Sequence, residues 1–139
     1  MRMDDGGFSF GYFMAEGGAS MWAALCCGSF GNTLALVALG VLVARKRAAA
    51  IGVGAATLLA GVGTLGVGVL GYWLGVRAVD QALLAADAAF VAEMRERGLS
   101  EAANNLWLGG LASAVPLLVG ALAIAVGALL PRGRDDRAE

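Results

Sequence analysis

An uncharged stretch, residues 51–76, constrains the fold of this chain more than any other feature of the sequence. As a helix with a rise of about 1.5 Å per residue, it is long enough to cross a hydrocarbon core of about 30 Å. It is also rich in glycine, which weakens a helix in water by roughly 0.5 to 1 kcal/mol relative to alanine. In lipid, small residues instead let helix backbones approach closely. We therefore predict a transmembrane helix that packs on other helices along much of its length.

The small residues of this stretch follow two regular spacings, and each set forms a smooth stripe along one side of a helix. The row that repeats every seven residues consists of Gly54, Gly61, Gly68 and Gly75. The row that repeats every four residues consists of Gly52, Ala56, Ala60, Thr64 and Gly68. We predict that both rows are packing surfaces, and that Thr64 is the polar contact at mid-depth.

Two further apolar stretches, residues 19–44 and residues 101–130, are also long enough to span a membrane. The chain is 59% hydrophobic, above the 45 to 50% that is usual for soluble domains. We predict an all-α integral membrane protein with three transmembrane helices. In the third span, Asn104 and Asn105 lie near the outer end and Pro116 lies at mid-span. Its small residues repeat every seven positions at Ser113, Gly120 and Gly127.

The basic residues predict how the chain crosses the membrane. Residues 45–50 form a very short link that begins Arg45-Lys46-Arg47 without an acidic residue, so the first two spans must form an antiparallel hairpin. The positive-inside rule places this turn in the cytoplasm. The N-terminus is then outside, and the basic tail, residues 131–139, is cytoplasmic. Residues 1–18 are acidic and rich in aromatic side chains, which predicts a segment at the periplasmic membrane interface.

Residues 77–100 are alanine-rich and amphipathic, and nothing between Val76 and Arg77 breaks a helix. We predict that the second helix extends into the periplasm, with Gly98 as its C-cap and Ser100 as the N-cap of the third helix. Near the end of this region, four charged side chains form either a solvated face or a docking surface for a partner. They are Glu93, Arg95, Glu96 and Arg97.

The composition excludes several kinds of function. A net charge of −1 gives no reason to expect nucleic-acid binding. The chain has no histidine, which excludes a Ser-His or Cys-His couple and an imidazole metal site. We predict no catalytic residue, no metal site, no cofactor and no enzymatic activity. Cys26 and Cys27 are adjacent, so they are poorly placed to bond each other; small buried residues, an intermolecular disulfide and a lipid site are the alternatives.

Three stretches, in this order, resemble the proton-channel family of ExbB, TolQ and MotA. Glu16–Trp22 is similar to the Gly-Gly and Met that open the first span of the family. Gly61–Gly68 is similar to its Gly-Thr-Val motif, with Thr64 at the threonine. Gly98–Pro116 is similar to its Gly-Ile-Ser-Glu-Ala stretch followed by Gly-Leu and Ala-Ile-Pro. The chain departs from the family in having only the short turn of residues 45–50 where members carry a cytoplasmic domain, and in lacking the threonine early in the third span.

The resemblance implies a multi-pass protein of the bacterial inner membrane, in a ring of typically five copies embedded in lipid. A single-span partner similar to ExbD, TolR or MotB, carrying an Asp, would thread the ring. Residues 19–44, 51–76 and 102–130, which we call the apolar spans, contain no Asp, Glu, Lys, Arg or His. The chain therefore cannot relay protons alone, and the partner must supply the acid. The pore and polar contacts would then be Thr64, Asn104, Asn105 and Pro116. The alternative is a structural or accessory membrane subunit that conducts nothing.

Overall fold

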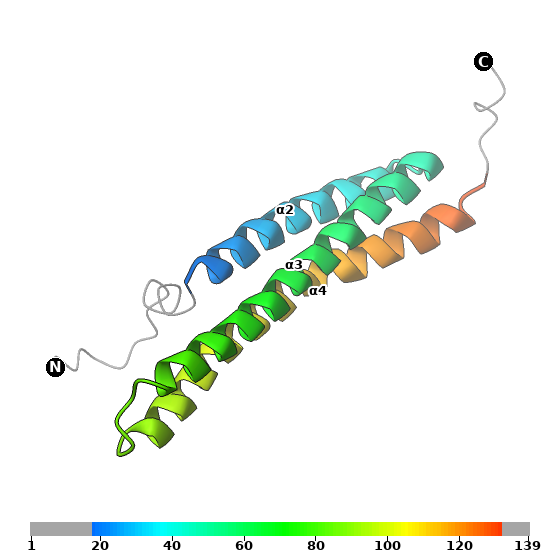
Figure 1. The fold of residues 1–139 in the computed structure, drawn as a ribbon. Helices are drawn as coiled ribbons and strands as arrows, with labels where there is room; N and C mark the ends of the chain where they lie inside the picture. The colour runs from blue at the N-terminus through cyan, green and yellow to red at the C-terminus, as the bar shows by residue number, and fades with distance from the viewer. Residues whose placement is uncertain (1–17, 132–139) are drawn as a thin grey trace, which may run out of the picture.

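The computed structural model describes residues 18–131, and all regular secondary structure in this range is helical. It consists of the long helices α2 (Gly18–Val43), α3 (Arg47–Leu83) and α4 (Val91–Leu129). Figure 1 shows these helices side by side in one elongated bundle. The predicted all-α class is confirmed. The predictions for the interfacial segment and the C-terminal tail fall on residues 1–17 and 132–139, which lie outside the described residues.

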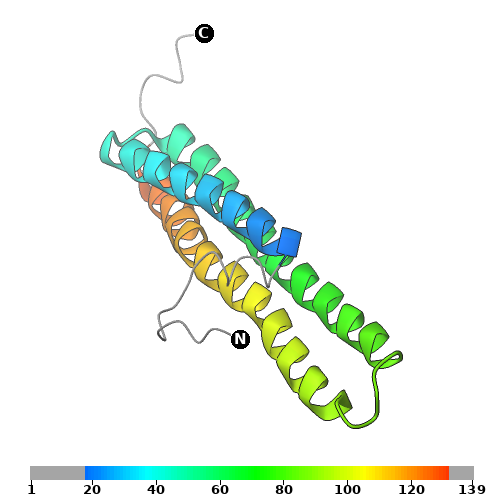
Figure 2. The same ribbon diagram turned by 90° about the vertical axis from the view of Figure 1, so that its left-hand side faces the viewer.

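The helices differ in length in a way that shapes the molecule. They have 26, 37 and 39 residues, which corresponds to about 39, 56 and 59 Å at about 1.5 Å per residue. All three are long and apolar enough to cross a membrane, as predicted. Figures 1 and 2 show that α3 and α4 continue as a two-helix hairpin beyond the start of α2. The side of the membrane on which this hairpin lies stays a prediction.

The turn between α2 and α3 is shorter than the predicted link, residues 45–50, because α3 already begins at Arg47. Arg45 has a φ of 54°, in the left-handed region. Its N–H donates to the carbonyl oxygen of Leu42 at 3.0 Å, and the N–H of Ala44 donates to that of Gly40 at 3.1 Å. These bonds satisfy carbonyl groups at the end of α2. The chain can therefore reverse within three residues, and α2 and α3 run antiparallel (Figure 2).

The turn between α3 and α4 lies earlier in the chain than predicted. α3 continues past Val76 to Leu83, in agreement with the expected extension, but α4 already begins at Val91. The turn depends on Asp87, whose Oδ1 accepts the N–H of Ala89 at 3.2 Å and whose carbonyl oxygen accepts the N–H of Phe90 at 2.9 Å. An aspartate that bonds the backbone two residues later is a common turn former.

Gly98 and Ser100, the predicted helix caps, therefore lie inside α4. Gly98 serves another purpose: a Cβ built on it would lie only 2.5 Å from Cγ2 of Val79. The absence of a side chain lets α3 and α4 approach at this level. From the sequence, a glycine at position 98 fits either a helix end or a close contact between two helices. The packing of α3 on α4 shows that it is a close contact.

The helices contact one another through buried residues that are almost all small and that recur at alternating spacings of three and four. This is the heptad spacing of coiled coils. We refer to these residues as the helix seam. On α2 they are Met21, Ala24, Gly28, Gly31, Ala35 and Ala38. On α3 they are Ala50, Gly54, Thr57, Gly61, Thr64, Gly68 and Gly71. On α4 they are Ala102, Asn105, Gly109, Ser113, Pro116, Gly120, Ala123 and Gly127.

Most of the surface of each helix faces away from the seam. In the most apolar window of each span, 22% of the residues of α2 and 28% of those of α3 and of α4 are buried within the chain. Large apolar side chains such as Leu36, Leu59 and Leu118 are about 70% exposed. Lipid or the helices of other subunits must cover this surface, because it is too apolar to face water.

Candidate functional site: polar and glycine contacts of the helix seam

The glycines that repeat every seven residues in α3 face α4. A Cβ on Gly54 would lie 2.9 Å from Cβ of Ala123, and one on Gly75 would lie 2.8 Å from Cβ of Ala102. Between them, Gly68 lies against Gly109, and a Cβ on Gly68 would lie 2.8 Å from the Cα of Gly109. Backbone therefore packs directly on backbone at the middle of the α3/α4 pair.

The matching row of α4 is equally tight. A Cβ on Gly120 would lie 2.6 Å from the backbone nitrogen of Leu58 and 2.9 Å from the carbonyl oxygen of Gly54. One on Gly127 would lie 3.0 Å from Cγ1 of Ile51. Since no side chain larger than hydrogen fits at Gly120 without moving backbone, the spacing of the two helices depends on this residue.

A polar contact joins α2 and α4 at the end of the three-helix part of the bundle. Oγ of Ser20 donates to Oδ1 of Asn105 at 2.7 Å, and Asn105 is only 4% exposed. Gly71 of α3 completes this layer, because a Cβ on it would lie 2.8 Å from Cβ of Ser20. Asn105 was predicted from the sequence as a polar contact. Its bond with Ser20 depends on the register of α2 against α4, which the sequence does not show.

Asn104 lies apart from this layer. It is partly exposed and borders a surface depression on α4 whose other lining residues are Ser100 and the charged residues Glu93, Glu96, Arg97 and Glu101. Neighbouring residues on a helix point about 100° apart, so Asn104 and Asn105 cannot face the same helix. The structure therefore separates two residues that the sequence suggested as joint pore contacts.

Thr64 is fully buried within the bundle of this chain. Its Oγ1 donates to the carbonyl oxygen of Ala60 at 2.9 Å, within the same helix. Thr57, which sequence reasoning did not single out, is also fully buried and bonds Val53 in the same way at 2.8 Å. Thr57 lies seven residues before Thr64, so the two side chains lie on the same side of α3. This spacing is the sequence feature from which Thr57 could have been predicted as a buried residue. Both hydroxyl groups are satisfied without another subunit.

Pro116 is a packing residue between α4 and α2. It is buried inside α4, and a Cβ on Gly31 would lie 3.1 Å from its Cγ. A proline has no N–H, so the carbonyl of Ala112 lacks its usual partner within the helix. Ala112 packs against Gly28, where a Cβ would lie 2.6 Å from that of the alanine. Gly28 and Gly31 of α2 therefore leave space for Ala112 and Pro116 of α4, the two residues between which the helical hydrogen bond is missing.

The glycines on the outward side of α3 are different. A Cβ on Gly52, Gly63 or Gly66 would meet no neighbouring atom within 4 Å. Gly52 and Ala56, from the four-residue row, are exposed, so the first part of that row is not a contact within this chain, whereas Thr64 and Gly68 at its end belong to the seam. Beside it lies an apolar groove of about 680 Å³ between α2 and α3, and its lining consists of Cys26, Cys27, Phe30, Leu34, Ala56, Leu59, Ala60, Gly63 and Thr64. We refer to it as the lateral groove.

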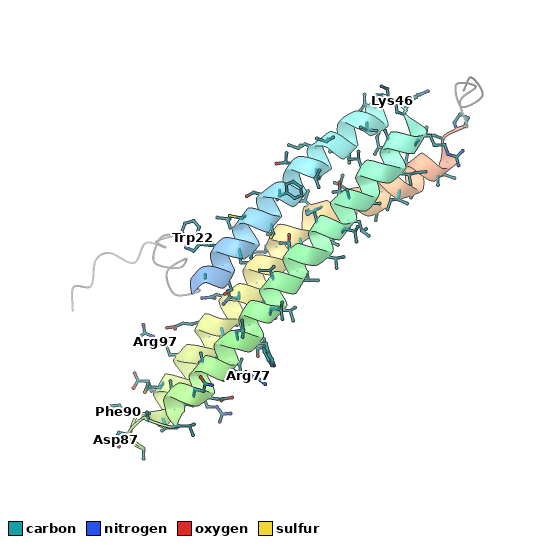
Figure 3. All side chains as sticks on the ribbon, turned by 45° about the horizontal axis from the view of Figure 1, so that its top comes forward. Trp22, Lys46, Arg77, Asp87, Phe90 and Arg97 are labelled. Atoms are coloured by element: carbon teal, nitrogen blue, oxygen red, sulfur yellow. The ribbon has the colours of Figure 1, made fainter. Side chains whose placement is uncertain are left out.

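The charged side chains of the described part of the chain lie outside the apolar spans. Arg45, Lys46 and Arg47 gather at one end, as Figure 3 shows for Lys46. At the other end, Nε of Arg97 pairs with Oε1 of Glu101 at 3.0 Å, and the guanidinium of Arg77 lies 3.8 Å from the ring centre of Trp73. Across residues 18–131, no group of His, Cys, Asp and Glu could hold a metal, and no buried polar side-chain atom lacks a hydrogen bond.

Three apolar helices of spanning length, joined through a seam of small residues, indicate a helical membrane protein. Comparisons of the chain with family models, with curated proteins and with solved structures give no match.

Proposed function

We propose that the chain is a non-enzymatic subunit of a homo-oligomeric complex of the bacterial inner membrane, and that neighbouring copies pack against the outward side of α3. One observation carries this proposal: Gly52, Gly63 and Gly66 face open space, while the seam glycines of the same helix are tightly packed. Small residues on a lipid-facing side allow another helix to approach closely, which is the main source of helix association in membranes.

The shape of this side supports a helix as the occupant. Gly52, Ala56, Gly63 and Gly66 follow spacings of four, seven and three residues, which keeps them on one stripe of α3. The lateral groove runs beside that stripe and is lined mainly by apolar atoms. A pocket for a polar ligand would need a few convergent polar groups, and apart from two cysteines the only polar side chain that lines this groove is Thr64, whose hydroxyl group is bonded within α3.

The resemblance to ExbB, TolQ and MotA extends the proposal to proton conduction. In this form of the proposal the ring surrounds a single-span partner whose Asp is the titratable group at membrane depth. The absence of Asp, Glu, Lys, Arg and His from the apolar spans supports a borrowed acid rather than a resident one. With the basic turn in the cytoplasm, the α3/α4 hairpin would extend into the periplasm.

A non-conducting scaffold is the second candidate, and a specific observation favours it. Thr64, Asn105 and Pro116, three of the predicted polar contacts, are buried in the bundle of this chain, and the two side chains that can form hydrogen bonds do so there. A partner helix would meet apolar side chains and glycine instead. Such a surface can hold a helix in place without providing it with a path for protons.

The native mass of the solubilised particle tests assembly. Gly52→Leu and Gly63→Leu are expected to shift the particle from oligomer to monomer, because leucine would occupy the space that a neighbouring helix needs. Gly40→Leu is the matched control: Gly40 lies on α2 at about the depth of Gly52 and also faces open space. A monomeric wild-type particle, or an oligomer that all three variants leave intact, contradicts the proposed interface.

Proton flux separates the two candidates. Vesicles that contain the chain together with a single-span partner bearing an Asp should conduct protons, and vesicles that contain the chain alone should not. Replacing that Asp with Asn should abolish the flux. A stable oligomer that binds the partner without any flux supports the scaffold.

A further inference from the structure

The surface on which α2 lies continues beyond the start of that helix. Ser20, close to the beginning of α2, contacts Asn105 of α4 and packs against Gly71 of α3. From this layer α3 runs on for 12 residues, Tyr72–Leu83, over about 18 Å, with α4 beside it. Among the described residues no third helix covers this hairpin (Figures 1 and 2).

A groove marks the uncovered surface. It has a volume of about 430 Å³ and is lined by Ala78, Val79, Ala82, Leu83, Met94, Arg97, Gly98 and Glu101. We refer to it as the hairpin groove. Two residues of α4 meet α2: Ala112 contacts Gly28, and Asn105 contacts Ser20. They are seven residues apart, and Gly98 in the groove lies a further seven residues before Asn105. The groove therefore lies on the side of α4 that faces α2. In Figure 3, Arg97 lies on the same side of the α3/α4 pair as Trp22 of α2, and Arg77 lies on the other side.

The hairpin exposes several large apolar side chains. Met94, which lines the groove, is 45% exposed, and Phe90 and Leu84 nearby are 58% and 88% exposed. This part of the molecule lies beyond the end of α2, where the bilayer no longer covers it if α2 spans the membrane. Apolar surface in such a position favours a covering segment.

We propose that the hairpin groove binds the aromatic segment of the same chain, residues 8–14, which has the sequence FSFGYFM. Three residues, 15–17, join this segment to Gly18, the first residue of α2, and α2 meets the α3/α4 pair at Ser20. Phe10 is eight residues from Gly18, a separation that spans about 12 Å as helix and about 28 Å when extended. Ala82 lies 11 residues beyond Gly71, or about 17 Å along α3. The segment therefore reaches the groove, and its tether gives it a high effective concentration there.

The test measures protection of the groove in the full-length protein. Cys26 and Cys27, both exposed, are first replaced by alanine. Ala82→Cys then places a thiol in the groove, and Asp80→Cys places a matched thiol on the exposed opposite side of the same turn. The reaction rate with a charged maleimide is compared between the intact chain and a chain that lacks residues 2–14. The thiol at position 82 should react several-fold more slowly in the intact chain, and the thiol at position 80 equally fast in both.

A second measurement identifies the occupant. Phe10→Cys combined with Ala82→Cys should form a disulfide within one chain under mild oxidation, and Phe10→Cys combined with Asp80→Cys should not. An unchanged rate at position 82 after truncation places the segment elsewhere, such as among lipid headgroups, and overturns the proposal. A disulfide between chains assigns the groove to a second copy and overturns it as well.

The native mass of the same samples keeps this result separate from the proposed oligomer. Groove protection in a monomeric particle supports the intramolecular contact and contradicts only the assembly.

Discussion

Gly120→Ala tests whether the seam of α3 and α4 is as tight as the structure indicates. The added methyl group would lie 2.6 Å from the backbone nitrogen of Leu58, 2.9 Å from its Cα and 2.9 Å from the carbonyl oxygen of Gly54. All three are backbone atoms, so a side-chain rotation cannot relieve the contact. Either the helices separate locally or the alanine remains compressed.

The magnitude follows from two opposing effects. Overpacking of a well-packed core costs about 1 to 3 kcal/mol. Alanine is the better helix former and offsets about 1 kcal/mol of this cost. Because the contact is with backbone, we expect the upper part of the range, and a net loss of about 1 to 2 kcal/mol in the free energy of unfolding.

The matched control is Gly110→Ala in the same helix. A Cβ at Gly110 would meet no neighbouring atom within 4 Å, so only the gain in helix propensity applies. We expect this variant to be unchanged or up to about 1 kcal/mol more stable. The assay is unfolding of the protein in mild detergent by titration with sodium dodecyl sulfate, followed by far-ultraviolet circular dichroism. Equal stability of the two variants refutes the close approach of α3 and α4.

Three further predictions concern polar side chains. A double-mutant cycle of Ser20→Ala and Asn105→Ala should give a coupling energy of about 0.6 to 1.7 kcal/mol by the same titration, as for other hydrogen bonds between membrane helices, and zero coupling contradicts the bond. Thr64→Val should change the free energy of unfolding by less than about 1 kcal/mol. It should also leave proton flux in partner-containing vesicles unchanged, because the side chain is fully buried and bonded within α3. A loss of flux at unchanged stability places Thr64 at the pore. Glu101→Gln removes an exposed ion pair with Arg97 and should cost less than about 0.5 kcal/mol at low salt and nothing measurable at 1 M salt, whereas a larger loss shows an additional role of the carboxylate.

The sequence predicted the helices well because their signals are local. Long apolar stretches, the basic turn at residues 45–47 and the seven-residue spacing of Gly54, Gly61 and Gly68 each depend only on nearby residues. The spans and the short α2/α3 turn therefore agree with the structure.

What the sequence did not predict depends on contacts between distant residues. Gly98 looked like a helix end, and it is a close contact with Val79, 19 residues earlier. The two stripes of α3 looked equivalent, but the row of Gly54 meets α4 along its whole length, whereas the row of Gly52 begins on the outward side and reaches α4 only at its end, at Gly68. Small-residue patterns mark which sides of a helix can pack, and the partner of each side is set by the tertiary arrangement.

The contacts of bulky side chains with glycines also determine the axial position of α3 against α4. Leu117 fits at Gly61, Ile51 at Gly127 and Val79 at Gly98, so three such notches are spread along the pair. A shift of one helix by a single residue, about 1.5 Å, would move each of these side chains off its glycine toward a neighbour that carries a Cβ. These few large side chains therefore prevent α3 and α4 from sliding along each other, although most residues of the seam are small. Motions that keep the contacts intact are expected to be rotations or bends of the helix pair rather than translations along its axis.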